Sequence, residues 1–308
     1  MTKYKFILLC GPTGSGKGSV PEKLAELKPG EFKKIEKDEY VTESKFYKTI
    51  ISQIIEGLGI DKIIAIINGN DTKKKKDLTD LFNAIYFNAS QNAITCDTNF
   101  KDLNCAQLHD KKLGEQIKIN DKHIVLEING DKDYSWIFYN TEEVSKTSYF
   151  NKTHSEKLLK DYDIEIYYLS GDFNQLLDDN KDRFIRTLNT CNKDNCETRL
   201  GNFLMEEVYK NTIVEIFKTI DNLKDTLFRN ENIKVYYFKR VGKNYIPLKD
   251  KYSYFMSFNI GDKLTLKEQI YFMSYINSFS EKSRKGGKKK KKRKTKRRKY
   301  KKIKTKRR

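Results

Sequence analysis

Residues 5–19 read KFILLCGPTGSGKGS and join a short apolar run to a glycine-rich loop. The apolar run, which ends at Cys10, is typical of a strand that is buried on both faces of a parallel sheet. Glycines in the loop at 11–19 permit the positive φ angles that aim successive backbone N–H groups at phosphate oxygens. The stretch therefore predicts a buried strand, a phosphate-binding loop and the start of a helix.

The loop predicts a nucleoside triphosphate, ATP or GTP, as its ligand, together with Mg²⁺. The N-terminus of the following helix adds partial positive charge to the site, and Lys17 supplies a mobile cation for the β and γ phosphates. The nucleotide-binding residues expected from this pattern are Gly11, Pro12, Thr13, Gly14, Ser15, Gly16, Lys17, Gly18 and Ser19.

The end of the loop departs from the usual pattern, which places Ser or Thr directly after the lysine as an Mg²⁺ ligand. Gly18 occupies that position here, and Ser19 follows one residue later. This ending resembles the adenylate kinase version of the loop, in which the metal relies more on water and phosphate. Ser19 is therefore the weakest of the expected ligands.

Strand and helix patterns alternate along the rest of the chain, which predicts an α/β fold with right-handed crossovers. We expect a parallel five-stranded sheet flanked by helices, with a return strand at 245–248 paired to the fifth through Gly242. The expected strands are 5–10, 32–37, 123–130, 164–169 and 233–239. The expected helices are 17–27, 42–58, 173–188, 201–224 and 264–279.

Residues 59–120 form an insertion whose pattern is mostly helical. The stretch at 63–67 is compatible with helix or strand, and Lys73 to Lys76 are expected in a charged loop. Because the insertion falls where a phosphoryl acceptor should bind, we expect it to set specificity.

Positive charge is concentrated at the C-terminal end of the chain. Residues 282–308 carry 20 of the 62 Lys and Arg residues and no acid, which leaves 42 basic against 42 acidic residues elsewhere. A segment with so few apolar residues cannot form a core. We expect a kinase-like domain at 1–281 and a disordered polybasic tail at 282–308 that binds nucleic acid by counterion release. An acidic membrane surface and simple solubilisation are the alternatives.

The five cysteines are an odd number without the spacing of a disulfide framework. The apolar run at 6–10 is too short for a signal peptide, and no stretch approaches a membrane helix in length. We expect a reduced, intracellular protein, in the cytoplasm or nucleus, that is not secreted.

Three acids are candidates for the chemistry of transfer. Asp38 and Glu39 follow the second strand, and strand ends in such sheets face the ligand crevice. Asp38 is a candidate base for the acceptor hydroxyl and Glu39 its assistant; helix capping is the alternative for both. Glu127 lies in an otherwise apolar strand, where a carboxylate is costly unless it is paired or at the strand end.

Arg183 and Arg186 lie three residues apart and so share one face of the expected helix. They are candidates to close over the phosphates as a lid, joined by Arg199 from beyond a polar loop. The alternative is a solvated helix face that pairs with Asp178, Asp179 and Asp182.

With these residues in order, the chain resembles the zeta-toxin-like branch of P-loop kinases and, more narrowly, uncharacterised P-loop proteins of large DNA viruses. The matching pieces are FILLCGPTGSGKGS at 6–19, KIEKDEY at 34–40, HIVLEINGDKDYSWIF at 123–138 and IEIYYLSGDFNQLLDDNKDRFIR at 164–186. The resemblance implies that Asp38 activates the acceptor, Glu127 contacts substrate, and Arg183 and Arg186 clamp phosphates. It also implies a host cell or virion location. Gly18 and Glu36 depart from the family pattern.

The sequence thus predicts an ATP-dependent phosphotransferase that acts on a hydroxyl of a small molecule, a nucleotide or a polynucleotide end. The alternative is a catalytically silent nucleotide-binding protein that its tail tethers to nucleic acid. The oligomeric state and the acceptor do not follow from the residues.

Overall fold

The structure is a computed structural model that describes residues 3–92, 103–139, 149–191 and 205–269. Contacts within the chain divide it into two units, Met1–Asn259 and Ile260–Arg308. The first unit holds the sheet and its helices, and the described part of the second contains the 3₁₀ helix η3 at Gly261–Lys263. The polybasic tail and its boundary at 281/282 lie outside the described residues and stay predictions. The helix predicted at 264–279 is described only to residue 269.

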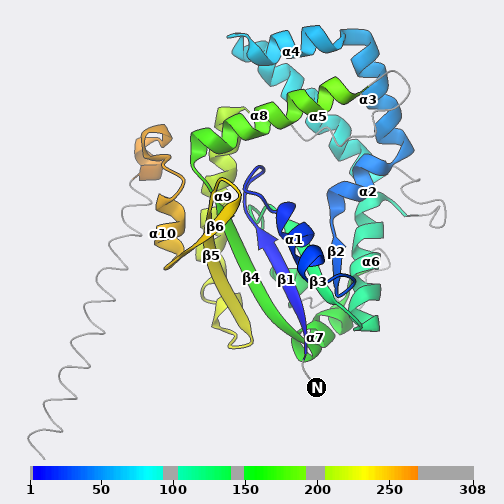
Figure 1. Cartoon of the computed structure of the whole chain (residues 1–308), viewed down its shortest axis with the longest axis vertical. Helices are drawn as coiled ribbons and strands as arrows, with labels where there is room; N and C mark the ends of the chain where they lie inside the picture. Colours follow the sequence, from blue (N-terminus) through cyan, green and yellow to red (C-terminus); the bar gives the residue numbers. More distant parts are fainter. Residues whose placement is uncertain (1–2, 93–102, 140–148, 192–204, 270–308) are drawn as a thin grey trace, which may run out of the picture. The chain divides into compact units, whose positions relative to one another are not determined.

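A single sheet organises the first unit, which confirms the predicted α/β class (Figure 1). Its strands are β1 (Tyr4–Cys10), β2 (Phe32–Ile35), β3 (His123–Ile128), β4 (Tyr162–Ser170), β5 (Ile233–Val241) and β6 (Asn244–Leu248). Their order is β2-β3-β1-β4-β5-β6, and all neighbours are parallel except β5 and β6. Within the described residues the sheet therefore has six strands, not the predicted five, because the return strand after Gly242 joins it.

Strand β1 lies at the centre of the sheet, as its continuous apolar run predicts. Its residues from Phe6 to Cys10 are buried. Parallel pairing aligns Leu9 with Glu127 of β3 on one side and with Tyr167 of β4 on the other. The carboxyl ends of these strands consequently meet at one edge of the sheet, directly beside the loop that follows β1.

The helices lie on the faces of the sheet and beyond the carboxyl ends of its strands (Figure 1). Helix α1 packs Val20 and Leu24 against Ile7 and Leu9 of β1. The α-helices are α1 (Ser19–Leu27), α2 (Lys37–Glu43), α3 (Lys45–Leu58), α4 (Ile60–Asn68), α5 (Thr72–Asn92), α6 (Cys105–Ile119), α7 (Lys152–Asp161), α8 (Phe173–Thr190), α9 (Glu206–Leu223) and α10 (Lys251–Met256). The remaining 3₁₀ helices are η1 (Ser135–Ile137) and η2 (Leu227–Arg229).

The structure corrects two local predictions and decides a third that the sequence left open. Strand β2 ends at Ile35, and the unexpected helix α2 begins at Lys37, so Asp38 lies in a helical first turn instead of at a strand end. Lys73 to Lys76 lie in helix α5, where i,i+4 pairing with Asp80 supports Lys76 in place of the predicted loop. The ambiguous stretch at 63–67 belongs to helix α4.

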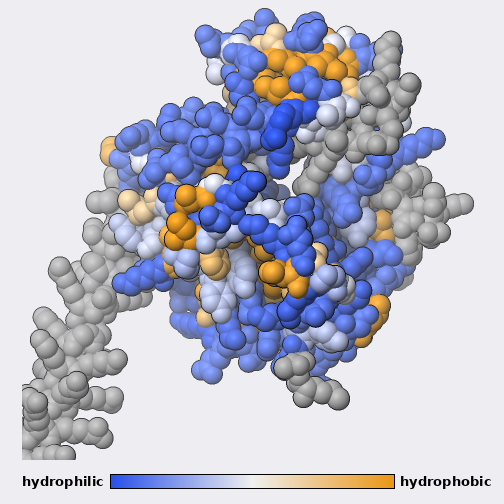
Figure 2. Space-filling model, viewed as in Figure 1, coloured by the Kyte–Doolittle hydropathy of each residue, from blue (hydrophilic) through white to orange (hydrophobic). Residues whose placement is uncertain are grey.

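The insertion at 59–120 is helical in its described part and builds a second apolar core with α8. Phe82 of α5 contacts Phe184 of α8 edge to face at 5.3 Å, and both are buried. Ile63 and Ile67 of α4 belong to the same cluster. Figure 2 shows an apolar area over these upper helices and a hollow between them and the sheet. The insertion thus fixes the helix that carries Arg183 and Arg186.

The described cysteines differ from the reduced state expected from their number and spacing. Cys10 is free and buried, whereas Cys105 and Cys191 each take part in a disulfide. Spacing in the sequence does not show which thiols folding brings together, which is why the expectation was wrong. Among the described helices, none is both long enough and apolar enough to cross a membrane.

Candidate active site

The loop between β1 and α1 has the conformation that an anion-binding loop requires. Gly14 and Gly16 have φ angles of 84° and 90°, which residues with a side chain rarely adopt. Helix α1 begins at Ser19, and its N-cap residue Gly18 provides no side-chain hydrogen bond. The first two N–H groups of this helix, those of Ser19 and Val20, donate to the carbonyl oxygens of Gly16 and Lys17 at 3.1 Å each, so the helix start is joined to the loop by turn hydrogen bonds.

Lys17 lies folded against the loop that carries it. Its Nζ donates hydrogen bonds to the carbonyl oxygens of Gly11 at 2.5 Å and Pro12 at 3.1 Å. Burial lowers the pKa of Lys17 to about 8, although the carboxylates of Glu127 and Asp38 oppose this shift. The side chain is nevertheless cationic at pH 7, and it faces two of the predicted acids.

A cavity of about 1060 Å³ opens above the loop, at the carboxyl edge of the sheet. It brings together six loop residues and four of the other predicted site residues. The predicted residues that line it are Thr13, Gly14, Gly16, Lys17, Gly18, Ser19, Asp38, Glu127, Arg183 and Arg186. Segments far apart in the sequence thus converge on one space.

Carboxylates come from the β2 and β3 side of the loop. Asp38 accepts a hydrogen bond from the hydroxyl of Tyr86, a residue of the insertion. Glu36 and Glu127 share the ammonium of Lys34, at 2.6 Å and 3.4 Å. Burial alone would lower the pKa of Lys34, but its hydrogen bond to Glu36 and the charge of Glu127 raise it. Glu127 is thus paired, as a carboxylate in an apolar strand must be.

Arginines come from the opposite side of the loop. Arg183 and Arg186 of α8 line the cavity with exposed side chains, and the Arg183 charge is close enough to influence Lys17. Arg240, near the end of β5, also lines it and forms an ion pair with Asp179 of α8 at 3.1 Å. Asp179, a candidate partner of Arg183 and Arg186 in the sequence, therefore pairs with Arg240.

Several predicted residues do not face the cavity. Gly11, Pro12 and Ser15 are buried loop residues that do not line the cavity. Glu39 is exposed on α2 and does not line it either. Arg199 lies outside the described residues.

The hydroxyl of Ser19 is already engaged within the protein. Its Oγ donates to the Gly16 carbonyl at 2.8 Å and lies 2.7 Å from the hydroxyl of Tyr245. Among the described residues, no group of three or more His, Cys, Asp or Glu side chains is arranged to hold a metal ion. Mg²⁺ needs only one or two protein carboxylates, and the cavity lining offers those of Asp38 and Glu127. The residues present thus fit an Mg²⁺ that is bound mainly through nucleotide phosphates and water.

Sequence reasoning missed Tyr86, Arg240 and Tyr245. Arg240 could have been selected by the rule that pointed to Asp38, that the carboxyl ends of parallel strands face the ligand crevice. It lies near the carboxyl end of β5, just before a turn. Tyr245 lies on the antiparallel return strand, and Tyr86 lies in the insertion, about 50 positions from its partner. No local pattern marks either tyrosine.

Comparison with known proteins adds little to this geometry. No protein-family model and no curated protein matches the chain. Among solved structures, it is similar to a protein of the PezAT chromosomal toxin–antitoxin system of Streptococcus pneumoniae, with 11% sequence identity and a TM-score of 0.46. The match covers 91% of this chain and 88% of that one. A likeness at this level carries no argument about function.

Proposed function

We propose that this protein is a P-loop phosphotransferase that moves the terminal phosphoryl group of ATP or GTP to a hydroxyl group. The observation that carries the proposal is that Lys17, Asp38, Glu127 and Arg183 share one cavity with the phosphate-binding loop. Phosphoryl transfer needs a phosphate cradle, a group that orients or deprotonates the nucleophile, and cations that neutralise developing charge. The cavity supplies residue types for all three needs.

In the proposed reaction the loop amides and Lys17 hold the β and γ phosphates. The acceptor oxygen forms a bond to the γ phosphorus while the bond from that phosphorus to the β–γ bridging oxygen breaks. The hydroxyl proton passes to the Asp38 carboxylate, and the nucleoside diphosphate leaves with the bonding electrons. Arg183 and Arg186 neutralise the charge on the transferring group. When bound with the nucleotide, Mg²⁺ supplies further neutralisation of the phosphate oxygens.

The two carboxylates beside Asp38 have a positional role in the same proposal. Glu127 and Glu36 hold Lys34 between them, so the acceptor meets a partly neutralised pair instead of two free charges. We infer that Glu127 contacts the acceptor, as the zeta-toxin-like resemblance implies. Membership of that family stays a prediction.

Transfer from γ-labelled ATP tests the proposal directly. The full chain is screened against nucleosides, nucleotides, sugars and oligonucleotides, because the acceptor class is open. We expect transfer to one class by the wild type, and a loss of about 10²- to 10⁴-fold in kcat for Asp38→Asn, the usual contribution of a positioned base. Lys17→Ala should lose nucleotide binding as well.

The control for Asp38 is Glu39→Gln, which alters the exposed neighbour and should leave kcat unchanged. Tight ATP binding without turnover on any acceptor class would contradict the proposal and favour the catalytically silent nucleotide-binding protein.

A further inference from the structure

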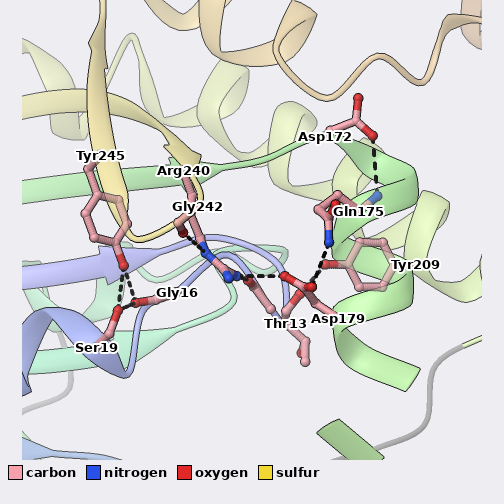
Figure 3. A network of polar contacts seen from close by, with 11 residues as sticks. Thr13, Gly16, Ser19, Asp172, Gln175, Asp179, Tyr209, Arg240, Gly242 and Tyr245 are labelled. Atoms are coloured by element: carbon pink, nitrogen blue, oxygen red, sulfur yellow. Dashed lines mark hydrogen bonds and ion pairs between the residues drawn. The ribbon is translucent and has the colours of Figure 1, made fainter. Parts of the chain in front are cut away.

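Three side chains from distant elements each donate a hydrogen bond to a carbonyl of the phosphate-binding loop (Figure 3). The Tyr209 hydroxyl of α9 donates to Thr13 O. The Arg240 guanidinium of β5 donates to Gly14 O at 2.5 Å, and the Tyr245 hydroxyl of β6 donates to Gly16 O at 2.6 Å. The loop backbone is thus held from outside at three of four consecutive residues.

Peptide geometry links these contacts to the amide groups that face a ligand. A peptide unit is planar and trans, so its C=O and the N–H of the next residue point in opposite directions. Fixing the Thr13 and Gly16 carbonyls therefore fixes the N–H groups of Gly14 and Lys17 on the other side of the chain. Both of those residues line the cavity.

Arg240 stabilises the centre of the loop and connects it to α8. Its Nη1 contacts both Gly14 O and Asp179 Oδ2, and its Nε donates to Gly242 O at 3.0 Å in the hairpin turn. The Ser15 N–H, which follows the Gly14 carbonyl, closes a turn by donating to Pro12 O at 3.2 Å. The planar guanidinium of Arg240 makes these contacts from two nitrogens that are held in fixed geometry, which the single nitrogen of a lysine cannot reproduce.

Tyr245 stabilises the end of the loop where α1 begins. Its single hydroxyl contacts Gly16 O and lies 2.7 Å from Ser19 Oγ, while its ring lies under the ammonium of Lys23. Because glycine residues have the largest conformational entropy to lose, this part of the loop has little rigidity of its own. Contacts from the β5–β6 hairpin supply the rigidity instead.

We propose that Arg240 and Tyr245 of the β5–β6 hairpin are positioning residues that hold the loop amides ready for a polyphosphate. This inference rests on the proposed nucleotide site. It differs from a direct phosphate contact, because Arg240 acts through the Gly14 carbonyl and not through its charge. Binding energy is then gained without the cost of ordering the loop when the ligand arrives.

Binding of ATP, inorganic triphosphate and adenosine to the full chain tests the inference. We expect Tyr245→Phe to lower the affinity for ATP and for triphosphate about 10-fold, and Arg240→Ala to lower both affinities about 10- to 100-fold. Small displacements of groups in preorganised sites have effects of this size. Arg240→Lys should lose as much affinity as Arg240→Ala, within about threefold, because lysine keeps the positive charge but not the forked geometry of the guanidinium group. Adenosine binding should be unchanged in all three.

Matched controls come from the same chain. Arg229→Ala breaks an exposed ion pair, 2.8 Å long, between Arg229 and Asp225, which is remote from the loop. Tyr252→Phe removes the hydroxyl of an exposed tyrosine. Both should bind ATP as the wild type does. If Arg240→Ala fails to fold, Arg240→Lys and Tyr245→Phe decide the question.

Three results would overturn the inference. Wild-type triphosphate affinity in Arg240→Lys would show that its charge acts directly, and wild-type affinity in Tyr245→Phe would show that the loop needs no external support. If the losses in triphosphate binding free energy of Arg240→Lys and Tyr245→Phe simply add in the double variant, the two residues do not act together on one loop. If the wild type itself does not bind ATP, the proposed function fails, which is a different outcome.

Discussion

At the scale of single residues, the site depends on which glycines in the loop are required by geometry. Gly16 has a φ of 90°, and a Cβ built on it would collide with the Tyr245 hydroxyl. Gly18, two positions later, has a φ of −60° and open space around its ideal Cβ. The two glycines look alike in the sequence, but only Gly16 has a conformation that excludes side chains.

This contrast gives a stability prediction for the ligand-free protein. We expect Gly16→Ala to lower the free energy of unfolding by about 1–3 kcal/mol, the cost of a strained backbone conformation. Gly18→Ala should raise it by about 0.4–1 kcal/mol, because alanine restricts the unfolded chain without strain. Urea denaturation of both variants measures the difference. Equal effects of the two substitutions would contradict the loop geometry.

Several of the residues that line the cavity near the loop could be selected from the sequence by their chemical type and position. The pattern around Lys17 defined the loop, and Asp38, Glu127 and Arg183 line the same cavity that it does. The roles of these residues stay predictions. Arg240 was not selected, because its contact with the Gly14 carbonyl joins positions 226 residues apart and leaves no local signal.

At the scale of elements, the insertion has a structural task that its sequence did not reveal. Its helices pack on α8, with Phe82 against Phe184, and Tyr86 reaches Asp38. The insertion therefore supports both the arginine helix and the candidate base. Periodicity predicted that it is mostly helical but not which surfaces it covers, because apolar spacing identifies a buried face without naming its partner.

A pair of substitutions on α5 tests this packing. Phe82 is 3% exposed and Phe87 is 63% exposed on the same helix. We expect Phe82→Ala to cost about 3–5 kcal/mol of unfolding free energy, as loss of a buried phenylalanine does. Phe87→Ala should cost less than about 0.5 kcal/mol. Thermal unfolding followed by circular dichroism compares them, and a mild effect at Phe82 would show that the cluster does not anchor α8.

Local sequence patterns explain which strands and helices were predicted and which were missed. Buried strands such as β1 and β4 were found because their apolar runs are continuous. Helix α2 was missed because KDEYVTE is short and largely polar, and its helical form depends on packing Val41 into the insertion core. Tertiary contacts of this kind do not appear in a seven-residue window.

At the scale of the whole molecule, the polybasic tail at 282–308 stays a prediction that the described residues do not test. Its 20 basic residues without an acid should bind any nucleic acid by releasing counterions. We expect oligonucleotide affinity of the full chain to fall about 10³- to 10⁵-fold between 50 and 200 mM salt, as for 6–10 phosphate contacts. Fluorescence anisotropy of a labelled oligonucleotide measures it.

The matched control for the tail is a chain that ends at residue 281. This truncated protein should lose oligonucleotide binding and keep its affinity for ATP. Retained, salt-sensitive binding after truncation would place the nucleic-acid site in the body of the protein, whose Lys and Arg residues equal its acids in number.

The central claim of this account is that the loop at 11–19 grips a polyphosphate through its amides and Lys17. Calorimetric titration of the full chain with MgATP, at pH 7 and at pH 9, tests it most directly. Burial sets the pKa of Lys17 at about 8 in the free protein, so its amino group is mostly neutral at pH 9. A bound polyphosphate favours the charged form.

The account therefore predicts one ATP per chain at pH 7, with little proton uptake because Lys17 is already mostly charged. At pH 9 it predicts uptake of up to about one proton on binding, seen as a dependence of the heat on the buffer's ionisation enthalpy. Lys17→Met should abolish the uptake and weaken binding about 100-fold or more. Absence of measurable ATP binding by the wild type, at either pH, would contradict the claim.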